Sequence, residues 1–103
     1  MTVDFGRPLS AAIGRFGRDV VYAPRLGDPV TIQGILDTGV QPEGEAPGVY
    51  ALLSIADSVV SPLPEAGEEI TVDSSIYKIV RREIDAGKLV RLLLRFHREV
   101  GWR

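Results

Sequence analysis

Apolar and polar residues alternate most clearly near the end of the chain, in the segment 88–98. One face of this segment carries Val90, Leu92, Leu94 and Phe96. The other face carries Arg91, Arg95 and His97, together with Leu89 and Leu93. A strict period of two is typical of a β-strand with one buried face and does not fit the helical period of 3.6. The segment therefore predicts a strand whose apolar face lies in the core.

Other short apolar or alternating runs recur along the chain, separated by glycine, proline and acidic turn residues. The predicted strands are 19–23, 30–37, 49–55, 69–72, 75–84 and 88–98. The turns at 73–74 and 85–87 are short, so the strands that they join are expected to pair antiparallel. The pattern predicts a mainly β fold, a small antiparallel barrel or sandwich of about six strands with a short N-terminal helical segment.

The first part of the chain, residues 4–18, follows a helical period instead. The apolar residues at this spacing are Phe5, Leu9, Ala12, Ile13 and Phe16. Gly14 and Gly17 each cost about 1 kcal/mol relative to alanine inside a helix, so a helix here needs a surface to dock against. We expect residues 1–18 to form a flexible or helical segment and residues 19–103 to form a single β domain.

Two irregular places interrupt the strand pattern. The alternation slips at Gly34, which predicts either a β-bulge or the close approach of another backbone. Residues 38–48 contain three glycines, two prolines and two glutamates, a composition that predicts an irregular exposed loop. We expect the part 41–48 to be flexible in the free protein.

The tripeptide Asp37-Thr38-Gly39 resembles the catalytic turn of an aspartic protease. That enzyme class needs two carboxylates that share a proton, so a chain of 103 residues would have to dimerise. Downstream, the sequence lacks an apolar-apolar-Gly element followed by Arg or Asn, which would support such a turn, and the hairpin around Asp73-Ser74 lacks the glycine of a mobile flap. A dimeric aspartic protease is therefore an alternative, and the preferred interpretation is a strand end at which Asp37 caps a turn.

Composition argues against several other kinds of function. The chain has no cysteine, which excludes disulfides and thiolate metal sites. His97 is the only histidine, and a single histidine makes neither a metal site nor a nucleophile–base pair. The N-terminus is too polar for a secretory signal, and no segment approaches the ~20 apolar residues that span a bilayer. We therefore expect no enzymatic activity, no metal or other cofactor, and no membrane association.

The net charge of −2 conceals a strong segregation of charge along the chain. Residues 1–25 carry +2, residues 26–77 carry −9 and residues 78–103 carry +5. This predicts pairing between basic and acidic regions, either within one chain or between copies in an assembly. The basic C-terminal part also fits a small nucleic-acid-binding β-barrel, a further alternative. Exposed aromatic residues for base stacking are sparse, so we expect no specific nucleic-acid partner.

From Ile32 onward, the order of these features resembles the lambda-type head–tail joining proteins of tailed phages. The positions that match the family pattern are Gly34, Asp37, Gly67, Tyr77, Leu92 and Leu94. Two departures are visible: Glu68 stands where an aspartate is common, and residues 73–75 lack the usual glycine of the hairpin turn.

The resemblance implies a structural protein of a virion or prophage that joins the DNA-filled head to the tail, assembling as a ring at the neck. Another phage tail-completion or terminator protein is the alternative. The implied partners are a head-completion protein and a tail terminator or tail tube protein. The chain is expected to be a homo-oligomer in the virion, a monomer when free, and to occupy the host cytoplasm during assembly. The expected partner-contact residues are Phe5, Leu9, Ile13, Phe16, Pro42, Glu43, Glu45, Pro47, Arg91 and Arg95.

Overall fold

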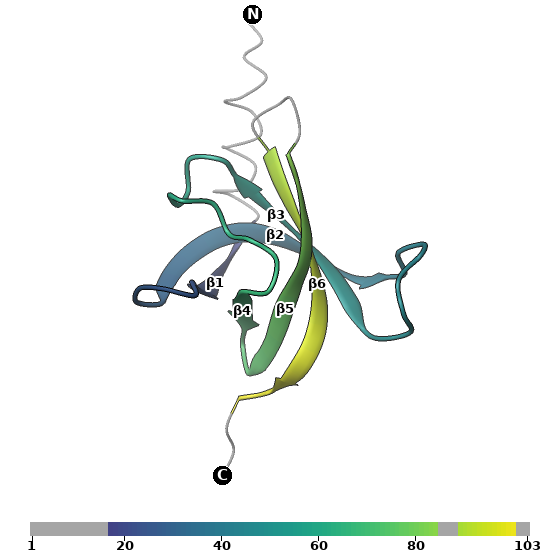
Figure 1. The fold of residues 1–103 in the computed structure, drawn as a ribbon. Helices are drawn as coiled ribbons and strands as arrows, with labels where there is room; N and C mark the ends of the chain where they lie inside the picture. Colours follow the sequence, from purple (N-terminus) through teal and green to yellow (C-terminus); the bar gives the residue numbers. More distant parts are fainter. Residues whose placement is uncertain (1–16, 85–88, 101–103) are drawn as a thin grey trace, which may run out of the picture.

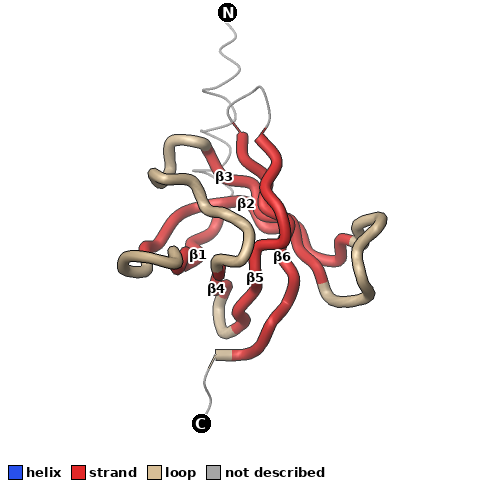
Figure 2. The backbone as a smooth tube through the Cα atoms, viewed as in Figure 1, coloured by secondary structure: helices blue, strands red, loops and turns tan. Residues whose placement is uncertain are grey.

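A computed structural model describes residues 17–84 and 89–100, and within these ranges it contains strands and loops but no helix (Figures 1 and 2). The strands are β1 (Arg18–Ala23), β2 (Val30–Val40), β3 (Tyr50–Ala56), β4 (Glu69–Val72), β5 (Ser75–Ile84) and β6 (Leu89–Glu99). Each of the six predicted strands is present. Of the N-terminal segment predicted to be helical, only Gly17 and Arg18 are described, and Arg18 already belongs to β1. The rest of that segment lies outside the described residues.

The six strands form one closed barrel in the order β1-β2-β3-β6-β5-β4. All neighbouring strands are antiparallel, and the pairs Val21↔Thr71 and Tyr22↔Ile70 between β1 and β4 close the ring. The sequence pattern had left both a barrel and a sandwich open. Pairing between β1 and β4 decides for the barrel, because it supplies partners to strands that would otherwise form the two edges of a sheet.

The inside of the barrel is apolar. Its buried residues are Val20, Tyr22, Ile32, Ala51, Leu53, Ile55, Ile70, Val72, Tyr77, Ile79, Val90, Leu92 and Leu94. The face predicted for β6 is confirmed, because Val90, Leu92 and Leu94 are completely buried. Leu93, which the pattern placed on the opposite face, is only 4% exposed and lies opposite Leu52 of β3. Burial in β6 therefore extends beyond the face that alternation predicts.

β2 is longer than predicted and contains the tripeptide Asp37-Thr38-Gly39. Pairing with β3 continues as far as Val40, with a register shift between Thr38 and Val40. Gly39 has a φ of 78°, a left-handed conformation that glycine adopts at little cost. The prediction that the strand ends at Asp37 and that this residue caps a turn is wrong, because the irregularity at Gly39 lets pairing continue past the tripeptide.

Gly34 is a point of close backbone approach between β2 and β3. A Cβ atom at this position would lie 2.8 Å from Ile55 Cγ2, 2.8 Å from Leu53 Cδ1 and 2.9 Å from the carbonyl oxygen of Ser54. Of the two possibilities predicted for Gly34, the close approach is confirmed, whereas the register shift of β2 lies at Thr38–Val40.

Candidate interaction surfaces

The β2–β3 loop, residues 41–49, is attached to the barrel near its C-terminal end. The buried Tyr50 donates a hydrogen bond from its hydroxyl to the carbonyl oxygen of Ala46 at 2.6 Å. Arg95 donates from Nη2 to the carbonyl oxygen of Pro47 at 3.1 Å. Its guanidinium carbon also lies 5.9 Å from the centre of the Tyr50 ring, within the range of a cation–π interaction. Strands β3 and β6 therefore hold this part of the loop.

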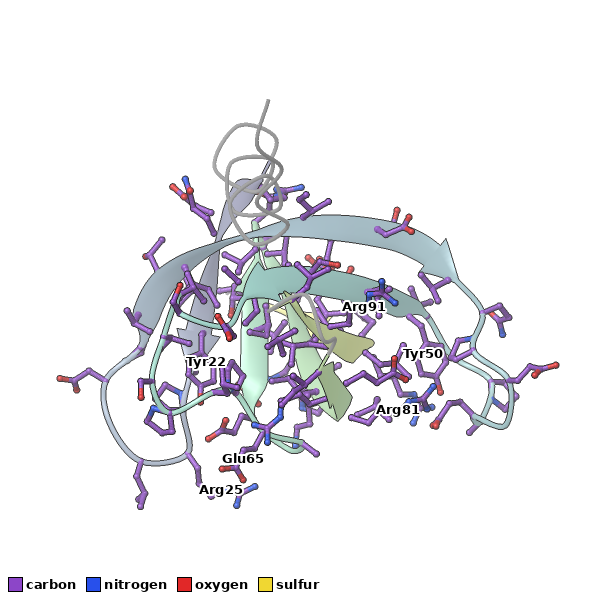
Figure 3. The ribbon with its side chains drawn as sticks, turned by 90° about the horizontal axis from the view of Figure 1, so that it is seen from above. Tyr22, Arg25, Tyr50, Glu65, Arg81 and Arg91 are labelled. Atoms are coloured by element: carbon purple, nitrogen blue, oxygen red, sulfur yellow. The ribbon has the colours of Figure 1, made fainter. Side chains whose placement is uncertain are left out.

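A third contact reaches the loop from β5. Arg81 donates from Nη1 to a carboxylate oxygen of Glu45 at 2.8 Å and from Nε to Glu83 at 3.4 Å. Glu45 belongs to the acidic middle of the chain and Arg81 to its basic end, so an ion pair joins the two regions as predicted. We call Tyr50, Arg81 and Arg95 the loop anchor. Figure 3 shows Tyr50 and Arg81 on the same side of the molecule.

The structure brings together most of the expected partner-contact residues that it describes. The β2–β3 loop carries Pro42, Glu43, Glu45 and Pro47. Arg95 contacts this loop, and Arg91 lies four residues earlier on the same face of β6, opposite Ser54 of β3 and Glu83 of β5. Outside the described residues lie Phe5, Leu9, Ile13 and Phe16. Partner binding by these residues stays a prediction. Because residues 45–47 are attached to the barrel, the prediction of a flexible loop now applies only to the tip of the loop.

Replacing Tyr50 by phenylalanine is expected to loosen the β2–β3 loop while keeping the buried ring. Loss of the hydrogen bond to Ala46 costs about 1 kcal/mol, which corresponds to an increase of about fivefold in the open population of the loop. Limited proteolysis with a glutamate-specific protease should therefore cleave at Glu43 and Glu45 about fivefold faster. Tyr22→Phe removes a hydroxyl on the other side of the barrel and serves as the control. Equal cleavage rates in the two variants would show that Tyr50 does not hold the loop.

A groove of about 540 Å³ lies between the β1–β2 loop (24–29) and the β3–β4 connection (57–68). We call it the acidic groove, because Asp28, Glu65 and Glu68 line it together with a single base, Arg25. Its apolar lining includes Leu26, Val30 and Leu63. In both Figure 1 and Figure 3, the β1–β2 loop projects on the side of the barrel away from the β2–β3 loop.

The floor of the acidic groove is a hydrogen-bonded cluster centred on the carboxylate of Glu68. Oxygen Oε1 accepts hydrogen bonds from the Tyr22 hydroxyl at 2.6 Å and from the backbone N–H of Glu65 at 2.8 Å. Oxygen Oε2 accepts one from the backbone N–H of Arg25 at 2.9 Å. A single carboxylate thus links β1, the β1–β2 loop and the β3–β4 connection.

The pKa values of the cluster show how its charge is held. Burial raises the pKa of Glu68, but hydrogen bonds from Tyr22 and from the backbone of Arg25 and Glu65 lower it by more, so the net pKa lies below the ordinary value. Burial, and then the hydrogen bond to Glu68, raise the pKa of the Tyr22 hydroxyl. Both pKa shifts lead away from neutral pH, so at that pH the Glu68 carboxylate stays ionised and the Tyr22 hydroxyl keeps its proton. The pair therefore acts as a structural clamp rather than as an acid–base pair.

No local pattern in the sequence points to this cluster. Glu68 was notable only because it stands, after Gly67, where the family pattern commonly has aspartate. Its partner Tyr22 is 46 residues away along the chain, and the two meet because β1 pairs with β4. The one available signal was therefore a departure from a family position, which by itself names no partner.

A second groove, of about 530 Å³, lies beside the attached end of the β2–β3 loop. We call it the basic groove, because Lys78, Arg95 and His97 line it without any acid. Its apolar lining comes from Val49, Val80 and Phe96. The Phe96 ring packs edge to face against Tyr77, with centroids 5.9 Å apart, so the apolar floor belongs to the barrel core.

The residues considered for catalysis or metal binding do not assemble into such a site. Asp37 is exposed within β2, opposite Leu52 of β3, so the turn that an aspartic protease needs is not formed. His97 is exposed on β6 beside the basic groove. Within residues 17–84 and 89–100, no group of three or more histidines and acids is placed to hold a metal ion.

The fold and these surfaces define a small β-barrel with two oppositely charged grooves. The family model described as phage head-tail attachment protein matches residues 1–95. The chain belongs to this family. A search of the curated proteins found no match to it.

Membership confirms the resemblance seen from Ile32 onward and extends it over the N-terminal segment. The protein is therefore a structural component of a phage virion with a role in joining head and tail. The described part of the chain has no helix with the length and apolar character needed to cross a membrane.

Proposed function

We propose that this protein assembles as a ring at the neck of the virion and there connects the DNA-filled head to the tail. The observation that carries the proposal is the family match over residues 1–95. One side of the ring would contact the head-completion protein, and the other would contact the tail terminator or the tail tube protein. Such a role requires contact surfaces rather than a catalytic group.

The shape of the domain supports this role. A closed barrel offers few free strand edges for pairing with another chain, so its contacts depend on side chains and projecting loops. The exposed tip of the β2–β3 loop and the N-terminal segment with Phe5, Leu9, Ile13 and Phe16 are the proposed contacts with head and tail proteins. Ordering of such segments during binding lowers the affinity per contact and makes assembly depend on the partner surface being present.

Inactivating the gene for this chain tests the proposed role directly. Electron microscopy of the lysate should show DNA-filled heads and tails of normal length that are not joined, and adding the purified protein should restore joined particles. Tails of abnormal length would instead assign the chain to tail termination, and heads that lose their DNA would assign it to head completion. Either result would contradict the joining role.

A further inference from the structure

The most exposed large apolar side chain among the described residues is Leu26, at the tip of the β1–β2 loop. It is 89% exposed, although it belongs to a short loop that Arg25 connects to the rest of the barrel through the Glu68 cluster. Asp28 lies two residues further along and forms no ion pair within residues 17–84 and 89–100. The loop thus presents an exposed apolar side chain close to an acid, and its backbone is held in place at Arg25.

The basic groove offers a surface that complements this loop. Val49, which is 63% exposed, Val80 and Phe96 form its apolar part. Lys78 and Arg95 lie directly opposite each other in the β5–β6 ladder, an unfavourable arrangement of like charges. Glu69 flanks Lys78 on β4 and offsets only one of the two charges. An additional carboxylate in the groove would therefore be favourable.

The positions of the β1–β2 loop and the basic groove favour a neighbouring copy of the chain as the occupant of that groove. Figures 1 and 3 show the β1–β2 loop and the β2–β3 loop, which borders the basic groove, on opposite sides of the same barrel. The loop of one copy therefore cannot reach its own basic groove but can reach that of a neighbour. Contacts between two different surfaces of identical subunits propagate head to tail and close into a ring when the rotation permits.

We propose that the Leu26 loop of one copy inserts into the basic groove of the next copy, with Leu26 against Val49, Val80 and Phe96, and the Asp28 carboxylate beside Lys78. This inference rests on the proposed ring at the neck and names the contact that builds it. The occupant of the basic groove is a second copy of this chain, and the charge segregation seen along the sequence supplies the complementary faces.

The absence of cysteine from the chain allows a direct test. Particles assembled with the doubly substituted chain Leu26→Cys, Val49→Cys are oxidised and analysed on a non-reducing denaturing gel. We expect a ladder of covalent multimers, because the two positions are far apart within one copy and adjacent between copies. The matched control is Ser58→Cys, Val49→Cys, which places one cysteine at an exposed position outside the acidic groove and should remain a monomer.

Exchanging the charges of Asp28 and Lys78 gives a second, independent test of the contact between copies. Asp28→Lys and Lys78→Asp should each reduce the number of joined particles about tenfold, and the double variant should recover most of that loss. If the neck contains a ring of the chain, but no ladder forms and the double variant does not recover, this contact is overturned and the proposed ring is left intact. Necks that contain no ring of the chain would overturn both proposals.

Discussion

Replacing Gly34 by alanine is expected to lower the free energy of unfolding by about 3 kcal/mol. The added Cβ would meet three atoms at 2.8–2.9 Å, and one of them is the backbone oxygen of Ser54. A side chain can rotate away from such a contact, but the Ser54 carbonyl cannot move without disturbing the pairing between β2 and β3. The melting temperature should fall by at least about 12 °C in a thermal unfolding measurement.

Gly39→Ala is the matched control for this prediction, because it lies in the same strand and adds the same methyl group. A Cβ at Gly39 would meet nothing within 4 Å, so only the φ of 78° opposes the substitution. The left-handed conformation costs about 1–2 kcal/mol for alanine. If Gly34→Ala were no more destabilising than Gly39→Ala, crowding between β2 and β3 would not be what requires a glycine at position 34.

Replacing Glu68 by glutamine is expected to cost about 2 kcal/mol at pH 7. The carboxylate accepts three hydrogen bonds, and the amide of glutamine retains only one acceptor oxygen, so donors from Tyr22, Glu65 or Arg25 lose their partner. Chemical denaturation at pH 7 measures the loss. Glu69→Gln, the neighbouring acid at the start of β4, is the control and should change stability by no more than about 0.5 kcal/mol.

The stability difference between the wild type and Glu68→Gln should depend on pH in a defined direction. The pKa of Glu68 is lower in the folded state than its unfolded value of 4.5, so the folded state favours the ionised carboxylate. This contribution is complete above about pH 4.5 and is lost as the pH falls through the folded pKa. The difference between the two proteins should therefore shrink steadily below about pH 4.5. A difference that stayed constant between pH 7 and pH 3 would contradict the role assigned to the carboxylate charge.

The hydrogen-bonded cluster around Glu68, which acts as a clamp, should also affect the contact proposed between copies. Through the backbone of Arg25 it holds the start of the loop that presents Leu26 and Asp28. Weakening the clamp at low pH or by Glu68→Gln would loosen this loop and raise the entropy lost when it enters a neighbouring basic groove. In the cysteine test, we therefore expect the Leu26→Cys, Val49→Cys chain to yield fewer covalent multimers when it also carries Glu68→Gln. This difference should appear even at temperatures where the domain stays folded.

The strands were predictable because their signal is local. In β6 the alternation of Val90, Leu92 and Leu94 with polar residues reflects the pleat of the strand, and burial follows from it. The same local rule failed at Asp37-Thr38-Gly39, where loop-forming residues continue the strand. Pairing with β3 supplies the hydrogen-bond partners there, and Gly39 provides the conformation that the irregular register needs. Tertiary pairing therefore overrode the turn preference of the tripeptide.

The candidate surfaces show the same division. The β2–β3 loop and Arg95 were both among the expected partner-contact residues, and the structure brings them into contact with each other. The contact itself, together with the roles of Tyr50 and Arg81, was not predictable, because it joins residues from three strands. No sequence signal paired the two residues at the floor of the acidic groove, since Tyr22 and Glu68 meet only across the closure of the barrel.

The sequence by itself determined the class of fold, the six strands, the family pattern and the segregation of charge, because each of these is written in neighbouring residues or in their order. Only the tertiary structure decided that the sheet closes into a barrel, that Asp37 lies within a strand, and that the acidic and basic grooves occupy opposite sides. Those features depend on pairs such as β1 with β4, whose residues are distant along the chain and acquire a common surface only when the strands meet.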